Sequence, residues 1–292
     1  VSHKRKNTVL GKMSTVRHLT LKKTRRCAVG MLITPHQAKT KYGTSHIMKA
    51  YVDWFEDRGV YVVPIPYDTK DCDALFSMIN GLFIPGGETE YLLAHRAYMR
   101  TITRFVELSI QSNVYFPIWG TCFGMEALLS IIGGFTSFSP SVAHGRAPIQ
   151  FTSYAERSHM FRRCPKKLRS EFEQSPSTEQ NHEFGISPDE FKRNTHLTRF
   201  YHILATGTDE SGKEYVAAIE GKHYPIYGVM WHPERQRAPI GDYFADFFVS
   251  ELRKNKTSAK GMYLPSIRTM VTPHRCSHYP ELGREMCYFF KI

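Results

Sequence analysis

Short apolar runs and longer amphipathic stretches alternate along the first half of the chain. The apolar runs have the length and continuous hydrophobicity of buried strands, and they span residues 27–33, 60–65, 82–84 and 115–119. The stretches between them repeat apolar residues at helical spacing, and they span residues 45–58, 71–79 and 98–112. Strands that alternate with helices in this way predict an α/β fold, a doubly wound and mostly parallel sheet with helices on both faces.

The second half of the chain is less regular than the first. Helices are expected at 125–132 and 240–253, the end of a buried strand at 229–231, and a hairpin from 202–208 and 215–220, which flank Asp209-Glu-Ser-Gly212. Residues 133–194 are polar and show no clear period. We therefore expect irregular structure in that region, and we expect it to shape a substrate cleft.

One cysteine lies between two glycines where the strand at 115–119 ends and the next helix begins. In Gly120-Thr-Cys122-Phe-Gly124 the glycines allow the sharp bends of a nucleophile elbow without a Cβ clash. The start of a helix offers unpaired N–H groups and the positive end of the macrodipole, so we expect Cys122 to be partly activated as a thiolate before any base acts. The alternative, a buried cysteine that only fills space, stays open until a base is found.

A candidate base follows in Tyr227-Gly-Val-Met-Trp-His-Pro-Glu234. His232 comes after a buried strand, and Pro233 keeps the residue before it extended. The carboxyl ends of strands form the ligand-binding edge of an open α/β sheet, so His232 is expected at the same edge as Cys122. Glu234 is then placed to orient the imidazole. Together, Cys122, His232 and Glu234 predict a nucleophile, a base and an orienting acid.

These motifs resemble class I glutamine amidotransferase-like enzymes, and most closely the gamma-glutamyl hydrolase family. The matching segments are 30–33, 61–66, 79–87, 115–126 and 224–234, within a region of about residues 27–253. The resemblance implies the α/β fold of that family and a cysteine-dependent hydrolase of gamma-glutamyl bonds. It further implies folylpoly-gamma-glutamates as substrates, a thioester intermediate, and no metal or organic cofactor.

The resemblance also implies further site residues. Glu126 stands where amidotransferases typically carry glutamine, and its carboxylate is expected to accept hydrogen bonds from a substrate N–H; the alternative is a first-turn glutamate that complements the helix dipole. The N–H groups of Gly87 and Phe123 are expected to form the oxyanion hole, although Gly87 also fits a plain strand-ending turn. His182, in Asn181-His-Glu, is expected near the substrate.

Two other functions remain open at the level of sequence. The chain is alternatively a glutamine amidotransferase subunit that releases ammonia from glutamine, or a catalytically silent binding protein. Glu126 argues against the first, and the joint presence of Cys122, His232 and Glu234 argues against the second. A comparison of glutamine with a gamma-glutamyl dipeptide as substrates distinguishes an amidotransferase subunit from a gamma-glutamyl hydrolase. Labelling of the Cys122 thiol distinguishes a catalytically silent binding protein from an enzyme.

The charge of the chain is concentrated at its two ends. Of 292 residues with a formal charge of +12, residues 1–26 hold nine Lys or Arg and no acid, and residues 253–292 hold eight against two acids. We expect a disordered extension at 1–26, a catalytic domain at 27–253 and a basic, loosely attached extension at 254–292. The middle is mildly acidic. The expected partner is therefore a small-molecule substrate, with no nucleic acid bound through the folded domain and no membrane span, while a homodimer stays open.

Cysteine usage bears on metal binding and on the cellular compartment. Cysteines at positions 27, 72, 122, 164, 276 and 287 show no CxxC spacing, so no zinc site is expected, while their even number permits disulfides in an oxidising compartment. The resemblance implies a lysosomal, vacuolar or extracellular location. Residues 1–26 contain no apolar signal core, but a chain that begins with Val1 is typical of a fragment or processed form. Asn255-Lys-Thr257 has the form of a glycosylation acceptor.

Overall fold

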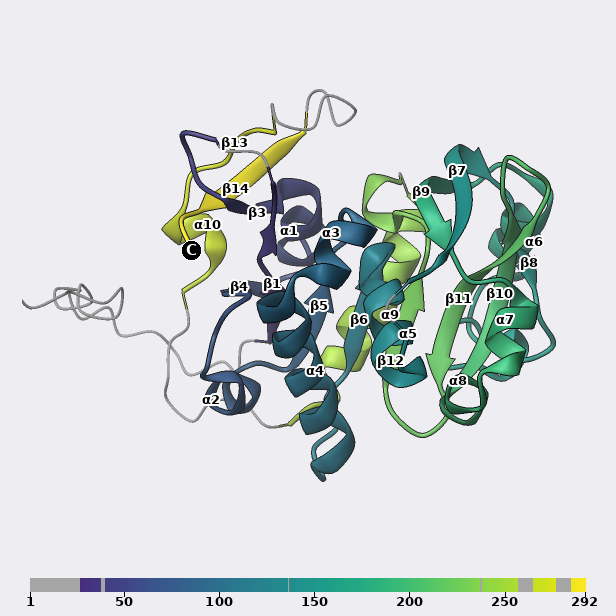
Figure 1. Cartoon of the computed structure of the whole chain (residues 1–292), viewed down its shortest axis with the longest axis horizontal. Coiled ribbons are helices and arrows are strands. Elements are labelled where there is room, and N and C mark those ends of the chain that lie inside the picture. The colour runs from purple at the N-terminus through teal and green to yellow at the C-terminus, as the bar shows by residue number, and fades with distance from the viewer. Residues whose placement is uncertain (1–26, 38–39, 136, 237, 257–264, 277–284) are drawn as a thin grey trace, which may run out of the picture.

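A large mixed sheet forms the centre of the molecule (Figure 1). The computed structural model describes residues 27–37, 40–135, 137–236, 238–256, 265–276 and 285–292. In spatial order the strands are β4 (Tyr61–Ile65), β1 (Ala28–Leu32), β5 (Gly81–Ile84), β6 (Ile118–Thr121), β12 (Ile226–Val229), β11 (Glu214–Gly221), β10 (Tyr201–Thr208) and β8 (Gln150–Phe151). The pairs from β4 to β12 are parallel, and those from β12 to β8 are antiparallel. The expected α/β sheet is therefore confirmed for these residues.

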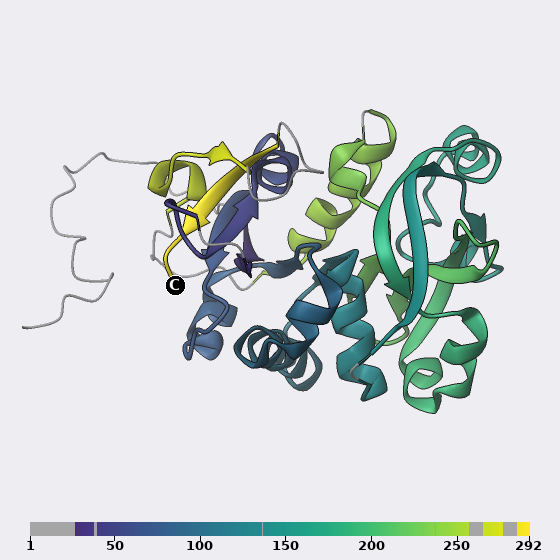
Figure 2. The ribbon, with the colours of Figure 1, turned by 45° about the horizontal axis from the view of Figure 1, so that its top comes forward.

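Helices cover both faces of the parallel half (Figure 2). α1 (Lys49–Glu56) packs against α9 (Ile240–Leu252) on one face, and α4 (Arg96–Gln111) packs against α2 (Cys72–Met78) and α5 (Phe123–Gly133) on the other. The remaining helices are α3 (Thr89–Ala94), α6 (Lys166–Gln174), α7 (Pro188–Arg193), α8 (Thr195–Phe200), α10 (Ile267–Met270) and the 3-10 turns η2 (Ala155–Arg157) and η3 (Pro233–Arg235). Trp119 on β6 lies in the core between Trp54 and Phe248. Aromatic packing between α1, β6 and α9 thus fixes the strand that precedes the candidate nucleophile.

The region expected to be irregular contains a long antiparallel pair. β7 (Ser139–Ala147) pairs with β9 (Thr178–Gly185) in a separate two-stranded sheet, so the expectation of irregular structure at 133–194 is wrong there. Exposed positions dominate β7, so its sequence lacks the apolar alternation by which half-buried strands are recognised. We call the pair β7 and β9 the arm. The backbone N–H of His232, just after β12, donates to the carbonyl of Glu179 on β9 at 2.8 Å and so joins the arm to the central sheet.

The start of the helix expected at 45–58 is instead a strand. β3 (Ser45–Met48) precedes α1 and pairs with β2 (Thr34–Pro35) and with β14 (Met286–Phe290), which pairs in turn with β13 (His274–Arg275). Helical periodicity continues through 45–48 in the sequence. The partner strand that overrides it comes from the far end of the chain, where local pattern gives no signal.

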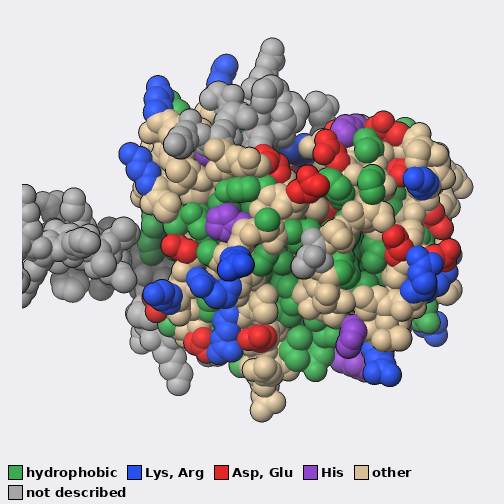
Figure 3. All heavy atoms as spheres, viewed as in Figure 1, with side chains coloured by type: hydrophobic (Ala, Val, Ile, Leu, Met, Phe, Trp, Pro, Cys, Tyr) green, Lys and Arg blue, Asp and Glu red, His purple; other side chains and the backbone are tan. Residues whose placement is uncertain are grey.

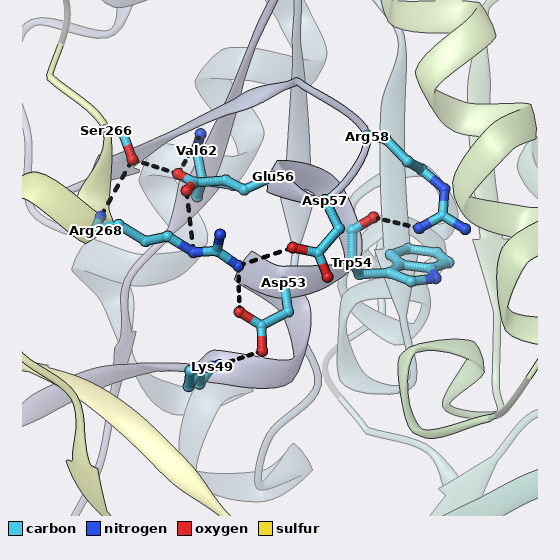
Figure 4. A network of polar contacts seen from close by, with 9 residues as sticks. All are labelled: Lys49, Asp53, Trp54, Glu56, Asp57, Arg58, Val62, Ser266 and Arg268. Atoms are coloured by element: carbon cyan, nitrogen blue, oxygen red, sulfur yellow. Dashed lines mark hydrogen bonds and ion pairs between the residues drawn. The ribbon is translucent and has the colours of Figure 1, made fainter.

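The C-terminal segment is attached to the domain by several kinds of contact. β14 pairs with β3, and Arg268 forms ion pairs with Asp53, Glu56 and Asp57 on and after α1 (Figure 4). Within the segment, a disulfide joins Cys276 to Cys287. The expectation of loose attachment is therefore wrong for the described part of 254–292. The N-terminal extension at 1–26 lies outside the described residues.

Three further observations concern the surface. The side chain of Asn255 is buried, and its amide donates to the carbonyl of Asn80 at 3.0 Å, so in the folded state it is not exposed as a glycosylation acceptor. None of the helices in the described segments is both long and apolar enough to cross a membrane. On the face shown in Figure 3, Lys and Arg side chains are scattered among Asp and Glu rather than joined in one basic surface.

Candidate active site

Three neighbouring parallel strands end at one edge of the sheet and bring the candidate residues together. β6 is paired with β5 on one side and with β12 on the other. Cys122 follows β6, the turn Pro85-Gly86-Gly87 follows β5, and His232 follows β12 after two residues. A Cβ placed on Gly86 would stand 2.9 Å from Cε1 of His232 and 3.3 Å from Cβ of Cys122. Only glycine leaves that space open between the two side chains.

The elbow at Cys122 has the strained backbone that its sequence predicts. Cys122 has φ 51° and ψ −114°, and it is the one non-glycine residue with positive φ in the described part of the chain. A Cβ on Gly120 would lie 2.4 Å from the carbonyl of Gly124, and a Cβ on Gly124 would lie 2.2 Å from the carbonyl oxygen of Ile84. Both glycines are therefore required by close backbone approach, and the strain is held by the surrounding packing.

His232 is oriented by a buried acid. Its Nδ1 lies 2.8 Å from Oε1 of Glu234, whose side chain is fully buried, so the carboxylate accepts the Nδ1–H and the lone pair remains on Nε2. Nε2 is buried and has no hydrogen-bond partner among the described residues. The hydroxyl of Tyr51 lies 3.4 Å from Nδ1 and accepts from the N–H of Gly86 at 3.2 Å. The imidazole is thus held with its basic nitrogen available.

The surroundings of Cys122 favour the protonated thiol. Burial raises the pKa of Cys122 well above its ordinary value, an ionised Glu126 would raise it further, and the backbone N–H of Phe123 lowers it only in part. The Sγ–H accordingly donates to the carbonyl of Asn181 at 3.7 Å. Burial therefore outweighs the partial activation that we expected from the helix terminus, although the Phe123 N–H does lower the pKa of the thiol. A base is needed.

An open cavity of about 630 Å³ lies over these residues. Its described lining comes from three parts of the fold: Gln37, His46, Met48 and Tyr51 around β3 and α1; Gly86, Gly87, Glu88, Thr89, Glu90 and Tyr91 after β5; and Cys122, His144, Asn181, His182, Glu183, Phe184, His232 and Arg235 around the elbow, the arm and η3. The volume is that of a typical small-molecule site. Cys122, His232, His182 and Gly87 of the expected set line it.

His182 is a neutral acceptor in this cavity. Its Nδ1 lies 2.9 Å from the carbonyl oxygen of Ser141 and 3.1 Å from that of Phe184, so Nδ1 carries the hydrogen. Burial lowers the pKa of His182 to about 4. Its Nε2 is therefore unprotonated at neutral pH, and it is buried without a partner among the described residues. This nitrogen can therefore accept a hydrogen bond from an N–H group of a substrate.

The sequence of this chain is similar to those of proteins of known family. Residues 44–251 match the family model described as glutamine amidotransferase class-I. Gamma-glutamyl hydrolase of Homo sapiens is 36% identical over 251 residues, covering 78% of this chain and 78% of that protein. Gamma-glutamyl hydrolase B of Dictyostelium discoideum is 33% identical over 256 residues, covering 78% of this chain and 72% of that protein. The chain belongs to the gamma-glutamyl hydrolase family.

A solved structure agrees with the class I glutamine amidotransferase fold of this family member. A GMP synthase subunit from Thermoplasma acidophilum superposes with a TM-score of 0.52, covering 79% of this chain and 94% of that one. The two sequences are 16% identical, so this likeness concerns the fold alone.

Three of the site residues expected for a gamma-glutamyl hydrolase, Glu126, Phe123 and Glu234, do not line the cavity. Glu126 is fully buried and does not line the cavity; Thr89, which does, donates to Oε2 of Glu126 at 2.7 Å. Burial raises the pKa of Glu126 to about 8, so its neutral form predominates at pH 7. The side chain of Phe123 is also buried away from the cavity, but its N–H reaches the thiol of Cys122. A donor role of the Phe123 backbone remains a prediction.

Several residues of this gamma-glutamyl hydrolase site were not identified from the sequence. Tyr51 fits the apolar face of an amphipathic helix, so its polar contact with Gly86 and His232 has no local signal. Asn181 acts through its carbonyl, which no side-chain pattern reveals. Arg235 had a usable signal, because it follows His232 by three residues in a turn. Within the described residues, no group of three or more His, Cys, Asp or Glu is arranged to hold a metal ion.

Proposed function

We propose that this protein hydrolyses gamma-glutamyl bonds with Cys122 as nucleophile and His232 as general base and acid. The observation that carries the proposal is the single cavity over the ends of β5, β6 and β12, in which a strained cysteine faces a histidine fixed by a buried acid. This arrangement supplies nucleophile, base and orienting group within one pocket. Family membership supports the same chemistry, since the relatives are named gamma-glutamyl hydrolases.

The first half of the reaction forms a thioester. Nε2 of His232 takes the proton of the Cys122 thiol, and the thiolate adds to the gamma-carbonyl carbon of the substrate. The N–H groups of Gly87 and Phe123 hold the resulting oxyanion. His232 then gives its proton to the leaving amine as the C–N bond breaks. Burial raises the pKa of the Cys122 thiol, so the proposed attack includes proton transfer to His232.

The second half regenerates the enzyme. His232 takes a proton from a water molecule, and the hydroxide adds to the thioester carbon. The C–S bond breaks, the released acid is the gamma-glutamyl product, and the sulfur of Cys122 recovers its proton from His232. Glu234 keeps Nδ1 protonated throughout and so holds the imidazole in the productive tautomer.

Folylpoly-gamma-glutamates are the substrate class that we propose within this chemistry. The resemblance carries this choice, and a cavity of about 630 Å³ is consistent with a substrate longer than one glutamyl unit. We also propose a lysosomal, vacuolar or extracellular location. The disulfide between Cys276 and Cys287 supports an oxidising compartment. A homodimer and the exclusion of nucleic acid remain predictions from the sequence.

Replacement of the nucleophile tests the proposed function. We expect Cys122→Ala to lower kcat for glutamate release from a gamma-glutamyl dipeptide by about 10⁴-fold or more, because removal of one catalytic group disables the whole unit. Product analysis on a defined pentaglutamate measures release and shows where the chain is cut. Cys164→Ala is the matched control, since Cys164 is a free cysteine outside the cavity lining. Wild-type turnover by Cys122→Ala would overturn the proposal, and preference for glutamine over the dipeptide would favour an amidotransferase.

A further inference from the structure

A single 3-10 turn places a guanidinium beside the base. His232 precedes η3, and Arg235 is the last residue of that turn. A 3-10 helix has three residues per turn, so side chains three apart lie on the same face. His232 and Arg235 accordingly both line the cavity, whereas Glu234 between them points into the protein and is fully buried.

Arg235 is held in place but incompletely paired. Its side chain is 18% exposed, and its Nε lies 3.7 Å from Oε1 of Glu234, beyond hydrogen-bond distance. That Nε is buried and has no hydrogen-bond acceptor among the described residues. Glu234 already accepts from His232 at 2.8 Å, so it is not a dedicated partner for the guanidinium. A buried donor without an acceptor is costly unless a ligand supplies one.

Arg235 is also the one Lys or Arg in the described cavity lining. The acids in that lining, Glu88, Glu90 and Glu183, repel an anionic ligand, and His182 is neutral because burial lowers its pKa to about 4. A permanent cation at Arg235 is therefore the strongest attraction that this wall offers to a carboxylate. The planar guanidinium fork matches a carboxylate with two parallel hydrogen bonds.

We infer that Arg235 binds the alpha-carboxylate of the glutamyl residue whose gamma-bond is cleaved, and so selects gamma-glutamyl substrates over other amides. This inference rests on the proposed function and names a specificity residue for it. Three carbons separate the gamma-carbonyl from the alpha-carboxylate, so the two ligand groups need two protein sites a short distance apart. Cys122 and Arg235 meet that need, since both line one cavity and Arg235 lies one 3-10 turn from His232, which is separated from Cys122 only by the space over Gly86.

The competing role for Arg235 is structural. Its ion pair with Glu234 at 3.7 Å and its field at Cys122 would support the catalytic groups without any contact with substrate. The two roles differ in one measurable respect. A residue that only supports Cys122 and Glu234 affects every substrate alike, whereas a carboxylate-binding residue affects only substrates that carry the carboxylate.

The experiment compares two substrates with the same leaving group. One is gamma-glutamyl-glutamate, and the other is 4-aminobutyryl-glutamate, which lacks only the alpha-carboxylate on the scissile residue. We expect Arg235→Met to lower kcat/KM for the first by about 30-fold or more, mostly through KM, and to change the second by less than about threefold. Arg235→Lys keeps the charge without the fork and should fall between wild type and Arg235→Met. Arg163→Met is the control for loss of one exposed positive charge and should change neither substrate.

Each outcome decides the inference. Collapse of the wild-type preference in Arg235→Met, with Arg235→Lys intermediate, supports it. Equal losses on both substrates overturn it and assign Arg235 to support of the catalytic groups. Should Arg235→Met fail to fold, the Lys variant decides: a loss confined to the carboxylate substrate supports the inference, and an equal loss overturns it. A wild-type enzyme inactive on gamma-glutamyl-glutamate overturns the proposed function as well, so the two failures are distinguishable.

Discussion

Burial decides the proton state of the acid next to the nucleophile. Glu126 is fully buried, accepts one hydrogen bond from Thr89 at 2.7 Å, and has no partner for Oε1 among the described residues. Burial raises its pKa to about 8. A charged Glu126 also raises the pKa of Cys122, so the neutral acid is the form that makes the thiolate easier to reach. Glu126 therefore couples stability and reactivity to the same proton.

The buried carboxyl of Glu126 should make the stability of the fold depend on pH. The pKa of Glu126 rises from an ordinary 4.5 to about 8 on folding, so between these values the folded chain keeps a proton that the unfolded chain releases. The stability from this group is fully present below pH 4.5 and is lost as pH rises toward 8, with a slope of up to about 1.4 kcal/mol per pH unit. Glu126→Gln stays neutral, so we expect urea unfolding between about pH 5 and 8 to show a flatter free energy of unfolding.

A second acid provides the control for this measurement. Glu214 on β11 is exposed, and Glu214→Gln should keep the wild-type slope. If Glu126→Gln instead shows the same loss of stability with pH as wild type, burial of this carboxyl is not the source of the slope.

For single residues, the sequence indicated which side chain is the candidate nucleophile, but it did not indicate how deeply that side chain and its neighbours are buried. Cys122 was identifiable because its flanking glycines are a backbone requirement, and the structure shows the positive φ that they serve. The protonated state of its thiol was not identifiable, because burial depends on the arm strand β9, which lies far along the chain. The position of Glu126 behind Thr89 was missed for the same reason.

At the scale of elements, the parallel half of the fold follows from local pattern. β1, β4 and β5 and the helix α9 lie within a residue or two of the ranges expected from apolar runs and periodicity. β3 was missed because its pairing partner, β14, is remote in sequence. The arm strands β7 and β9 were missed because neither shows an apolar alternation: β7 is mostly exposed, and the buried positions of β9 include the polar residues Thr178, Gln180 and His182.

The C-terminal segment supports one wall of the cavity. β14 pairs with β3, and His46 and Met48 of β3 line the cavity. Arg268 adds ion pairs to the acids of α1, with its Nε 3.1 Å from Oε2 of Glu56 (Figure 4). Since Arg268 is 39% exposed, solvent screens these pairs and each contributes little. The disulfide between Cys276 and Cys287 closes a loop inside the segment and fixes β14, the partner of β3, beside β13.

Removal of that disulfide tests the role of this element. Cys276 and Cys287 are 11 residues apart, and a loop of that size predicts a loss of about 2–3 kcal/mol in the free energy of unfolding for Cys276→Ser/Cys287→Ser. We also expect a higher KM for a gamma-glutamyl dipeptide, because β3 loses a fixed neighbour. Urea unfolding and steady-state kinetics measure the two effects. Cys164→Ser is the control, and a double variant that matches it in both measurements would show that β14 does not support the cavity wall.

At the scale of the whole molecule, the cavity lies between two parts of the fold. The loops that follow β5, β6 and β12 supply Gly86 to Tyr91, Cys122 and His232, while the arm formed by β7 and β9 supplies Asn181 to Phe184. In the free protein the arm meets the sheet at few polar contacts here, among them Cys122 to Asn181 at 3.7 Å and His232 to Glu179 at 2.8 Å. A substrate bound between the two parts adds contacts to both, so its binding energy opposes their separation.

Hydrogen exchange on the inactive enzyme tests this arrangement. In Cys122→Ala with a gamma-glutamyl dipeptide at about 100 times its Kd, the amides of β9 and of residues 86–91 should exchange up to about 100-fold more slowly, because opening there requires release of the ligand and costs about 2.7 kcal/mol more. β4 at the far edge of the sheet contributes nothing to the cavity and should keep its free-state rates. Protection of residues 86–91 without protection of β9 would place the substrate on the sheet alone, and the arm would then be a scaffold rather than a wall of the site.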